Sequence, residues 1–115
     1  MKLSERVNKK TGRNMVVNEG VDRAYMKNKF DAFCPLGNNT RTLTVETWIE
    51  YGEYIPDYLD IEDTCKELDG KSLIHEDAMV EWIKRLEIYE PKSVRVIIHA
   101  EGHFPMYEET VKVYK

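Results

Sequence analysis

The sequence has little cysteine, no long apolar run, and no repeated or low-complexity segment. Its two cysteines, Cys34 and Cys65, are too few for a disulfide framework or a four-cysteine zinc site, so we expect free thiols. No apolar stretch approaches the ~20 residues of a membrane-spanning helix, and the first residues lack the apolar core of a signal peptide. We therefore expect a cytoplasmic protein without a membrane partner.

Composition and charge indicate one globular domain with a basic start. Of the 115 residues, 42% are hydrophobic and 33% charged, which is typical of a soluble fold. Residues 1–29 carry eight Lys and Arg against three acidic residues, whereas the remainder carries nine against eighteen. We expect residues 1–22 to form a basic, potentially flexible arm, and 23–115 to form a single domain. The arm is a candidate contact for tRNA or DNA, although a solvated tail is the simpler interpretation.

Alternating patterns predict four strands. Residues 41–51 alternate with period two and are rich in β-branched and aromatic types, which indicates a strand with one apolar face. Residues 94–101 and 107–114 alternate in the same way on either side of a Gly102–Pro105 break, so we expect a hairpin. Residues 24–33 are a weaker candidate for a further strand. Together these segments predict a sheet interrupted in sequence by a helical region.

Two helices are expected between the second and third strands. Asp60 can cap a short helix that carries Ile61, Cys65 and Leu68 on one face and ends near Gly70. A longer helix follows, with Ser72 as a candidate cap and an end before Pro91. The order β-β-α-α-β-β predicts an α+β fold, an antiparallel four-stranded sheet with both helices on one face.

Such a sheet leaves one face and two edges uncovered. We expect Trp48, Ile97 and Tyr114 to lie on the face opposite the helices. Open edges and an apolar face are commonly covered by another chain. The sequence therefore predicts a homo-oligomer, with binding sites that can lie between subunits.

Two short segments carry the candidate chemistry. Cys34 precedes Pro35 at an expected strand end, where it could be a packed small side chain or a nucleophile activated by a nearby base or cation. His75, Glu76 and Asp77 open the second helix, where carboxylates are favoured by the helix dipole alone. A carboxylate there could also accept the paired N–H groups of a guanine-like or pterin-like ring.

Metal and phosphate sites have weak support in the sequence. His99 and His103 are four residues apart, a spacing that suits a helix, but they lie in the expected hairpin. We therefore expect no metal. The Gly-Asn-Asn turn after Cys34 lacks the spacing and the following Lys-Ser/Thr of a phosphate loop.

Taken together, "AFCP", "YIPDYL" and "LIHEDAMVEWIKRLEIYEPKSVRV" resemble the tunnelling-fold (T-fold) enzymes of 7-deazaguanine metabolism. The sequence is most similar to the NADPH-dependent 7-cyano-7-deazaguanine (preQ0) reductases of queuosine biosynthesis and their short relatives, the archaeosine-forming amidinotransferases. The similarity covers about residues 30–113. It implies that Cys34 attacks the nitrile to form a thioimide, that Glu76 anchors the ring, and that His75 lines the pocket, in a ring-shaped oligomer with sites between subunits.

The sequence departs from that family at two places. The reductases carry a proton-donating aspartate seven positions after the cysteine, where this chain has Arg41, so Asp31, Asp57 or Asp60 would have to substitute. The stretch associated with NADPH is also unmatched, which leaves NADPH as a candidate cofactor only. Two further hypotheses stay open: a non-catalytic T-fold protein that binds a purine or pterin, and a pterin synthase-like enzyme, which would need a histidine metal site.

Overall fold

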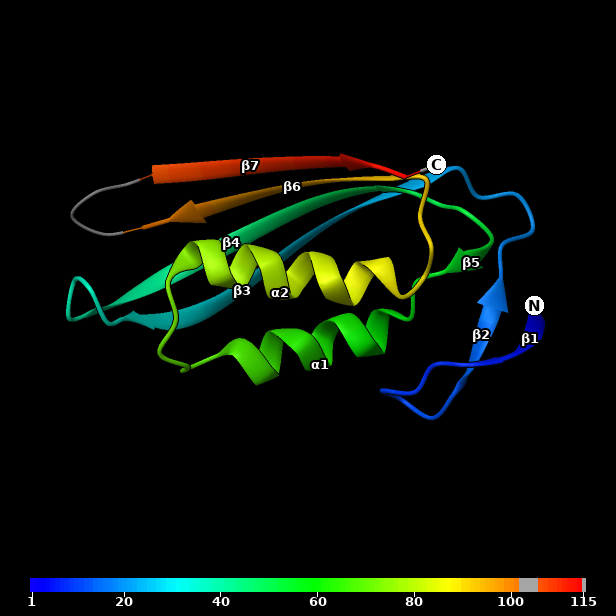
Figure 1. Cartoon of the computed structure of the whole chain (residues 1–115), viewed down its shortest axis with the longest axis horizontal. Coiled ribbons are helices and arrows are strands. Elements are labelled where there is room, and N and C mark those ends of the chain that lie inside the picture. The colour runs from blue at the N-terminus through cyan, green and yellow to red at the C-terminus, as the bar shows by residue number, and fades with distance from the viewer. Residues whose placement is uncertain (102–105, 115) are drawn as a thin grey trace.

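The computed structural model describes residues 1–101 and 106–114, and His103 lies outside them. The described chain forms seven strands and two helices (Figure 1). In chain order these are β1 (Lys2–Val7), β2 (Asn14–Val17), β3 (Arg23–Cys34), β4 (Asn39–Glu50), β5 (Tyr54–Ile55), α1 (Tyr58–Leu68), α2 (His75–Glu87), β6 (Ser93–Ala100) and β7 (Met106–Val113).

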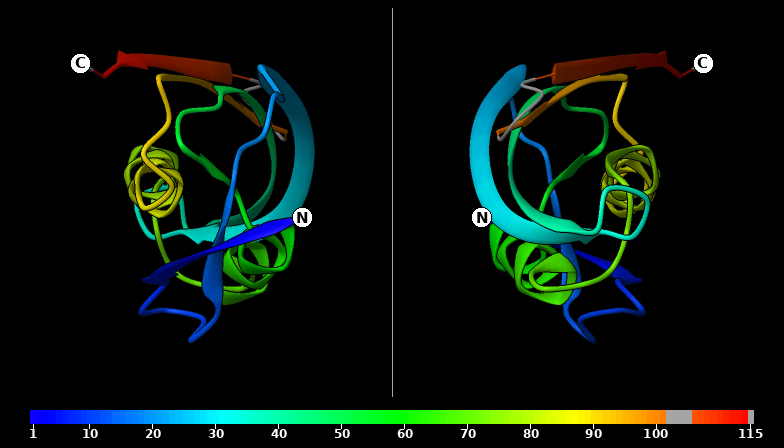
Figure 2. Two further views of the ribbon diagram at one scale, coloured as in Figure 1. Left: turned by 90° about the vertical axis from the view of Figure 1, so that its right-hand side faces the viewer. Right: turned by 90° about the vertical axis from the view of Figure 1, so that its left-hand side faces the viewer.

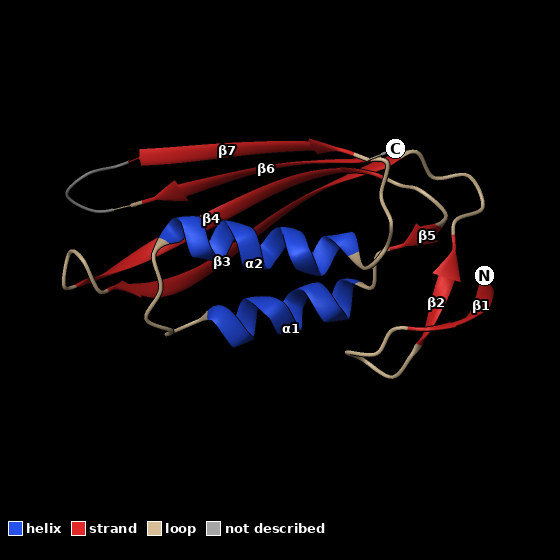
Figure 3. Ribbon diagram, viewed as in Figure 1, coloured by secondary structure: helices blue, strands red, loops and turns tan. Residues whose placement is uncertain are grey.

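The main sheet has four antiparallel strands in the order β3-β4-β6-β7 (Figure 3). β3 and β4 form a long hairpin in which Arg23 pairs with Glu50 and Cys34 pairs with Asn39. β4 pairs with β6, and β6 pairs with β7. The predicted α+β fold with a four-stranded antiparallel sheet is therefore confirmed.

Both helices pack on the same face of this sheet, and the sheet curves around them (Figure 2). The apolar positions that alternate along β4 all point into this layer and are buried. Trp82 of α2 is 1% exposed, and its indole N–H donates to Thr47 Oγ1 at 2.9 Å. A polar threonine in the core is thus paired, as a buried hydroxyl requires.

Both helices begin differently from the sequence prediction. Asp57, not Asp60, caps α1, because its carboxylate accepts the backbone N–H of Leu59 at 3.0 Å. Asp60 instead lies in the first turn and is fully buried. Ile74 occupies the cap position of α2 without a side-chain bond, so Ser72 is not the cap.

The first 22 residues, expected as a basic and potentially flexible arm, include strands β1 and β2. These pair with each other, and β2 pairs with β5, giving a second sheet in the order β1-β2-β5. Arg6 binds Glu90 at 2.8 Å, and Arg13 binds Asp57 at 2.7 Å. The segment is therefore connected to the domain through both backbone and side chains.

The helix-free face of the main sheet carries aromatic and cationic side chains. Tyr25 and Trp48 lie with ring centroids 5.1 Å apart, and the Arg95 guanidinium lies 4.6 Å from the Trp48 ring. Tyr114 was predicted on this face, but it packs against the helix-side core, because the even-numbered residues of β7 point that way. Among the described residues, no helix is long and apolar enough to cross a membrane.

Candidate functional site

The segment between the two helices joins Cys34 to the start of α2. Residues 69–73 run along the outer edge of β3, where Gly70 N–H donates to Asp31 O at 2.7 Å. Phe33 N–H donates to Lys71 O at 2.9 Å, and Leu73 N–H donates to Phe33 O at 3.1 Å, so Phe33 and Ser72 form a parallel bridge. The strand that ends at Cys34 and the segment that leads into α2 are therefore fixed side by side.

Cys34 is half-buried at the turn between β3 and β4. The backbone N–H of Gly37 donates to its sulfur at 3.4 Å. Because Cys34 pairs with Asn39 and Ala32 pairs with Arg41, these four side chains lie on the helix-side face. Asn39 Oδ1 and Arg41 Nε are buried without a hydrogen-bond partner among the described residues. Such atoms in a native site call for a further polar partner.

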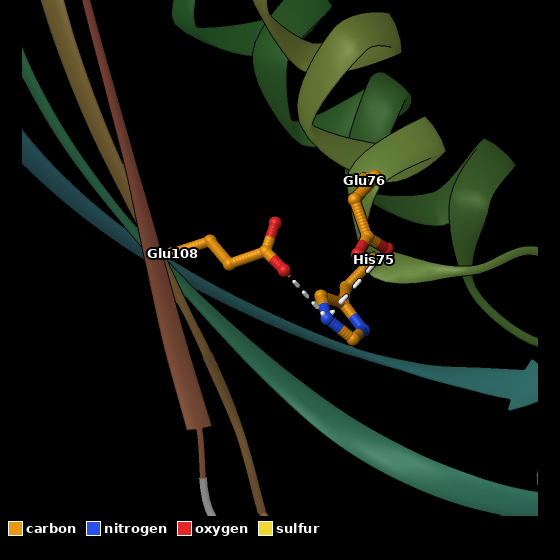
Figure 4. A group of neighbouring side chains, drawn as sticks. All are labelled: His75, Glu76 and Glu108. Carbon is orange, nitrogen blue, oxygen red and sulfur yellow. Dashed lines mark hydrogen bonds and ion pairs between the residues drawn. The ribbon is translucent and has the colours of Figure 1, made fainter.

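Three side chains converge where α2 begins and β7 passes (Figure 4). His75 Nε2 lies 3.0 Å from Glu108 Oε1 and 3.6 Å from Glu76 Oε2. The His75 side chain is only 13% exposed, whereas Glu108 and Glu76 are 32% and 53% exposed. The imidazole is thus enclosed and its two carboxyl partners open toward solvent.

The two carboxyl groups differ in their electrostatics. The backbone N–H of Glu76 itself, at the start of the helix, lowers the pKa of Glu76. Burial, followed by a hydrogen bond with Glu76 and its charge, raises the pKa of Glu108. Glu76 is therefore the ionised acceptor of the pair, and Glu108 is the group that more readily holds a proton.

The same three residues offer ligand atoms that lie within 4.8 Å of one another, close enough to hold a metal ion. An imidazole nitrogen with two carboxylate oxygens suits a divalent cation such as Zn²⁺ or Mn²⁺. Glu108 was not identified from the sequence, because its strand pattern shows which face it occupies but not that α2 begins opposite it.

The other predicted residues are not members of this cluster. Asp77 is exposed at the helix start, and Cys34 belongs to the neighbouring turn. The proposed substitutes for the proton donor have other partners: Asp57 caps α1, Asp60 binds Arg85 at 2.7 Å, and Asp31 accepts a hydrogen bond from Thr42. Asp57 and Asp60 lie at the end of α1 remote from the β3–β4 turn (Figure 1).

Cys65 behaves as predicted for a core cysteine. It packs against the main hydrophobic cluster, and its thiol donates to Lys29 O at 3.7 Å. Burial raises the pKa of the Cys65 thiol, which disfavours the reactive thiolate. Of the two cysteines, Cys34 is therefore the candidate nucleophile.

A cavity of about 1060 Å³ lies away from these candidate residues. It opens between the N-terminal sheet and the start of α1, and its lining includes Leu3, Val21, Leu59 and Tyr89. None of Cys34, His75, Glu76 and Glu108 lines it. Its size suits a ligand, but its walls are mostly apolar and include neither cysteine nor histidine. The candidate nucleophile Cys34 and the His75–Glu76–Glu108 cluster lie instead at the β3–β4 turn and the start of α2.

An antiparallel four-stranded sheet with two helices inserted between its hairpins defines the tunnelling fold. A solved structure described as "archaeosine synthase QueF-Like in the apo form" matches this chain with a TM-score of 0.74 and 12% sequence identity. The match covers 81% of this chain and 95% of that one. No family model and no curated protein matches the sequence. The structural likeness establishes the fold, and the reaction has to be argued from the site.

Proposed function

We propose that this chain is an enzyme of 7-deazaguanine metabolism that acts on the nitrile of 7-cyano-7-deazaguanine through Cys34. The observation that carries the proposal is the bridge between Phe33 and Ser72, which holds Cys34 beside the start of α2. Glu76 and His75 lie on the first turn of that helix. The archaeosine synthase likeness supports the same substrate class through the shared fold.

The proposed step is an addition. The Cys34 sulfur forms a bond to the nitrile carbon, one π bond of the nitrile breaks, and its nitrogen takes up a proton, which gives a thioimide. Glu76 accepts two ring N–H groups and directs the nitrile toward the sulfur, while His75 lines the pocket. Reduction to the aminomethyl product would then require two hydride equivalents from NADPH, whereas amidino transfer would require an amine that displaces the sulfur.

Arg41 bears on the choice between these outcomes. A guanidinium does not give up a proton near neutral pH, so Arg41 cannot replace an aspartate as the acid. A Cβ placed on Gly37 would lie 3.7 Å from Arg41 Nη2, so the guanidinium lies close to the Cys34 turn. There it would bind an anionic or carbonyl group of a substrate. Such a contact is compatible with NADPH, which carries phosphates, as well as with another second substrate.

The same residue supports a second candidate function. With a cation in the place of the proton donor, the chain could retain ring binding by Glu76 and lack catalysis, as a purine- or pterin-binding protein. A pterin synthase-like enzyme would need a metal, for which His75, Glu76 and Glu108 are the candidate ligands. Metal analysis of the purified protein separates that version, because stoichiometric zinc would support it and its absence would count against it.

We propose that the protein works as a homo-oligomer with its sites near subunit boundaries. Tyr25, Val111 and Val113 are at least half exposed on the helix-free face, so an apolar surface is left for another subunit.

A contact with tRNA or DNA would use Lys2, Lys9 and Lys10, which are exposed on the N-terminal segment.

Intact mass spectrometry after incubation with 7-cyano-7-deazaguanine tests the proposal. The wild-type protein should gain the mass of one whole nitrile molecule, and Cys34→Ala should gain nothing. Cys65→Ala is the matched control and should still form the adduct. A wild-type protein that stays unmodified, or an adduct that persists in Cys34→Ala, contradicts the proposal. NADPH and an amine donor are then added separately to the adduct. The co-reactant that returns the protein to its unmodified mass identifies the reaction, reduction for NADPH and amidino transfer for the amine.

A further inference from the structure

The turn between β3 and β4 gathers three polar groups around one backbone position, Gly37. The Gly37 N–H donates to Cys34 Sγ at 3.4 Å. A Cβ placed on Gly37 would lie 2.7 Å from Asn39 Oδ1 and 3.7 Å from Arg41 Nη2. The register of the two strands puts the side chains of Cys34, Asn39 and Arg41 on one face of the hairpin. The thiol, the amide and the guanidinium are therefore neighbours at the tip of this hairpin.

Two buried atoms of this group have no hydrogen-bond partner among the described residues. They are Asn39 Oδ1, which is an acceptor, and Arg41 Nε, which is a donor. An unpaired buried donor or acceptor is costly, so native sites normally supply its partner. The two atoms together call for a ligand that brings an acceptor for Arg41 and a donor for Asn39.

The charge of Arg41 points to the nature of that ligand. The arginines that form ion pairs with carboxylates are Arg6, Arg13, Arg85 and Arg95. Within residues 1–101 and 106–114, no carboxylate forms an ion pair with Arg41. Arg41 is half-buried, and a guanidinium in such a place binds carboxylates and phosphates through its planar fork.

We propose that Arg41 and Asn39 form an anion subsite beside Cys34, which binds the co-substrate of the thioimide. A carboxylate or phosphate of the co-substrate binds the Arg41 guanidinium, and one of its N–H or O–H groups donates to Asn39 Oδ1. The role as a co-substrate site rests on the proposed function, whereas the subsite itself rests on the geometry of the turn. An amine that carries a carboxylate and NADPH, which carries phosphates, share this chemistry.

Either co-substrate reacts at the carbon that is bonded to sulfur. With an amine, a C–N bond forms, the C–S bond breaks, and the proton that the amine loses goes to the sulfur. With NADPH, one hydride adds to this carbon and the C–S bond breaks, which returns the thiol and leaves an imine. A second NADPH reduces the imine to the aminomethyl product, and solvent supplies one proton for each hydride.

Alkylation of Cys34 by two matched reagents tests the subsite without any nitrile. Iodoacetate and iodoacetamide are similar in size, and each forms an S–C bond with the thiolate as iodide leaves, but only iodoacetate is an anion. Peptide mass spectrometry gives both rates at Cys34 in the full-length protein. The ratio of the iodoacetate rate to the iodoacetamide rate should fall about tenfold in Arg41→Gln, the effect of one lost charge-assisted hydrogen bond. Arg23→Gln, at the exposed far end of β3, should leave the ratio unchanged.

Two further measurements decide the question even where Arg41→Gln does not fold. Asn39→Asp keeps the size of the side chain and puts a carboxylate beside Arg41, so it should also lower the ratio at Cys34. Inorganic phosphate should slow iodoacetate at wild-type Cys34 in a saturable manner, beyond the effect of sodium chloride at equal ionic strength. A ratio that either variant leaves unchanged, or protection by phosphate no greater than that by sodium chloride, overturns the subsite.

The source of the anion is decided on the thioimide adduct with 7-cyano-7-deazaguanine. Intact mass spectrometry follows its release by glycine, by glycinamide, which lacks the carboxylate, and by NADPH. For a carboxylate-bearing amine, Arg41→Gln should lower the rate with glycine about tenfold relative to the rate with glycinamide. For NADPH, the same substitution should raise the KM for NADPH about tenfold.

The outcomes separate the two proposals. An adduct that no co-substrate releases, or that each releases equally well in wild type and Arg41→Gln, overturns the co-substrate role and leaves the Cys34 addition standing. Failure of the wild-type protein to form the adduct contradicts the proposed function and the co-substrate role with it. The alkylation ratios then still decide whether an anion subsite lies beside Cys34.

Discussion

Asp60 is a buried acid whose partners come from three separate parts of the chain. It is fully buried, accepts from Arg85 Nε at 2.7 Å, and accepts from Tyr89 Oη at 2.6 Å. Asn8, from the N-terminal segment, donates to Tyr89 Oη at 2.9 Å. The Asp60 carboxylate thus connects α1, α2 and the loop after β1 through one network.

Asp60→Ala should be strongly destabilising, since it leaves the Arg85 guanidinium buried without its main partner. We expect a loss of about 3–5 kcal/mol in the free energy of unfolding, the cost of breaking a buried ion pair. Denaturant unfolding measures it. Asp63→Asn is the matched control on the exposed face of the same helix and should change stability by less than about 0.5 kcal/mol. Equal effects of the two substitutions would show that the Asp60 network contributes little.

At the scale of elements, the turn after β4 packs tightly against the connection that leads from α2 to β6. A Cβ on Gly52 would lie 2.1 Å from the carbonyl oxygen of Glu90, which is backbone and cannot move aside. In the same region Lys92 N–H donates to Glu50 O at 2.9 Å. The two connections can therefore approach this closely only because residue 52 has no side chain.

Gly52→Ala should consequently lower the free energy of unfolding by about 1–3 kcal/mol or more, because the connections must separate. Gly37→Ala is a useful comparison, since the atom it would meet is the side-chain Oδ1 of Asn39, at 2.7 Å, which can rotate away. Thermal unfolding of both variants should show the larger loss for Gly52→Ala. An unchanged melting temperature for Gly52→Ala would contradict the packing described.

Elements with a strong repeating pattern were predictable, and those defined by distant partners were not. The alternation along β4 and the helical face around Trp82 follow from residue type alone, because each buries a continuous apolar side. β1 and β2 are short and largely exposed, and their pairing depends on β5, far along the chain. Asp60 fitted a cap by sequence, yet Asp57 begins the helix and leaves Asp60 free for Arg85.

In the candidate site, too, local features were predictable from the sequence and features set by distant partners were not. Cys34 before a proline and Glu76 at a helix start are local features, so the sequence could propose both as candidates, and their roles stay predictions. Glu108 contributes through its position opposite α2, which only the sheet order β3-β4-β6-β7 determines. The side of Tyr114, which follows β7, was also misjudged, since the more apolar side of that strand, with Val111 and Val113, faces away from the helices.

At the scale of the whole molecule, the helix-free face and the edges of the main sheet favour self-association. Val111 and Val113 are 57% and 75% exposed on that face, beside Tyr25 at 50%. We expect light scattering after size exclusion to give a mass several times that of one chain. Val111→Lys combined with Val113→Lys should shift the protein toward a monomer, whereas Val80→Lys, on the exposed side of α2, should not. A monomeric wild-type protein would contradict the assembly.

The central claim is that Cys34 and Glu76 act on one ring. A crystal structure of the protein soaked with 7-cyano-7-deazaguanine tests it most directly, because it locates both ends of the ligand at once. We expect a covalent bond from Cys34 Sγ to the former nitrile carbon, and the N–H groups of the ring bound to the Glu76 carboxylate. A ligand bound away from the β3–β4 turn, or with Cys34 unmodified and distant from the nitrile, would contradict it.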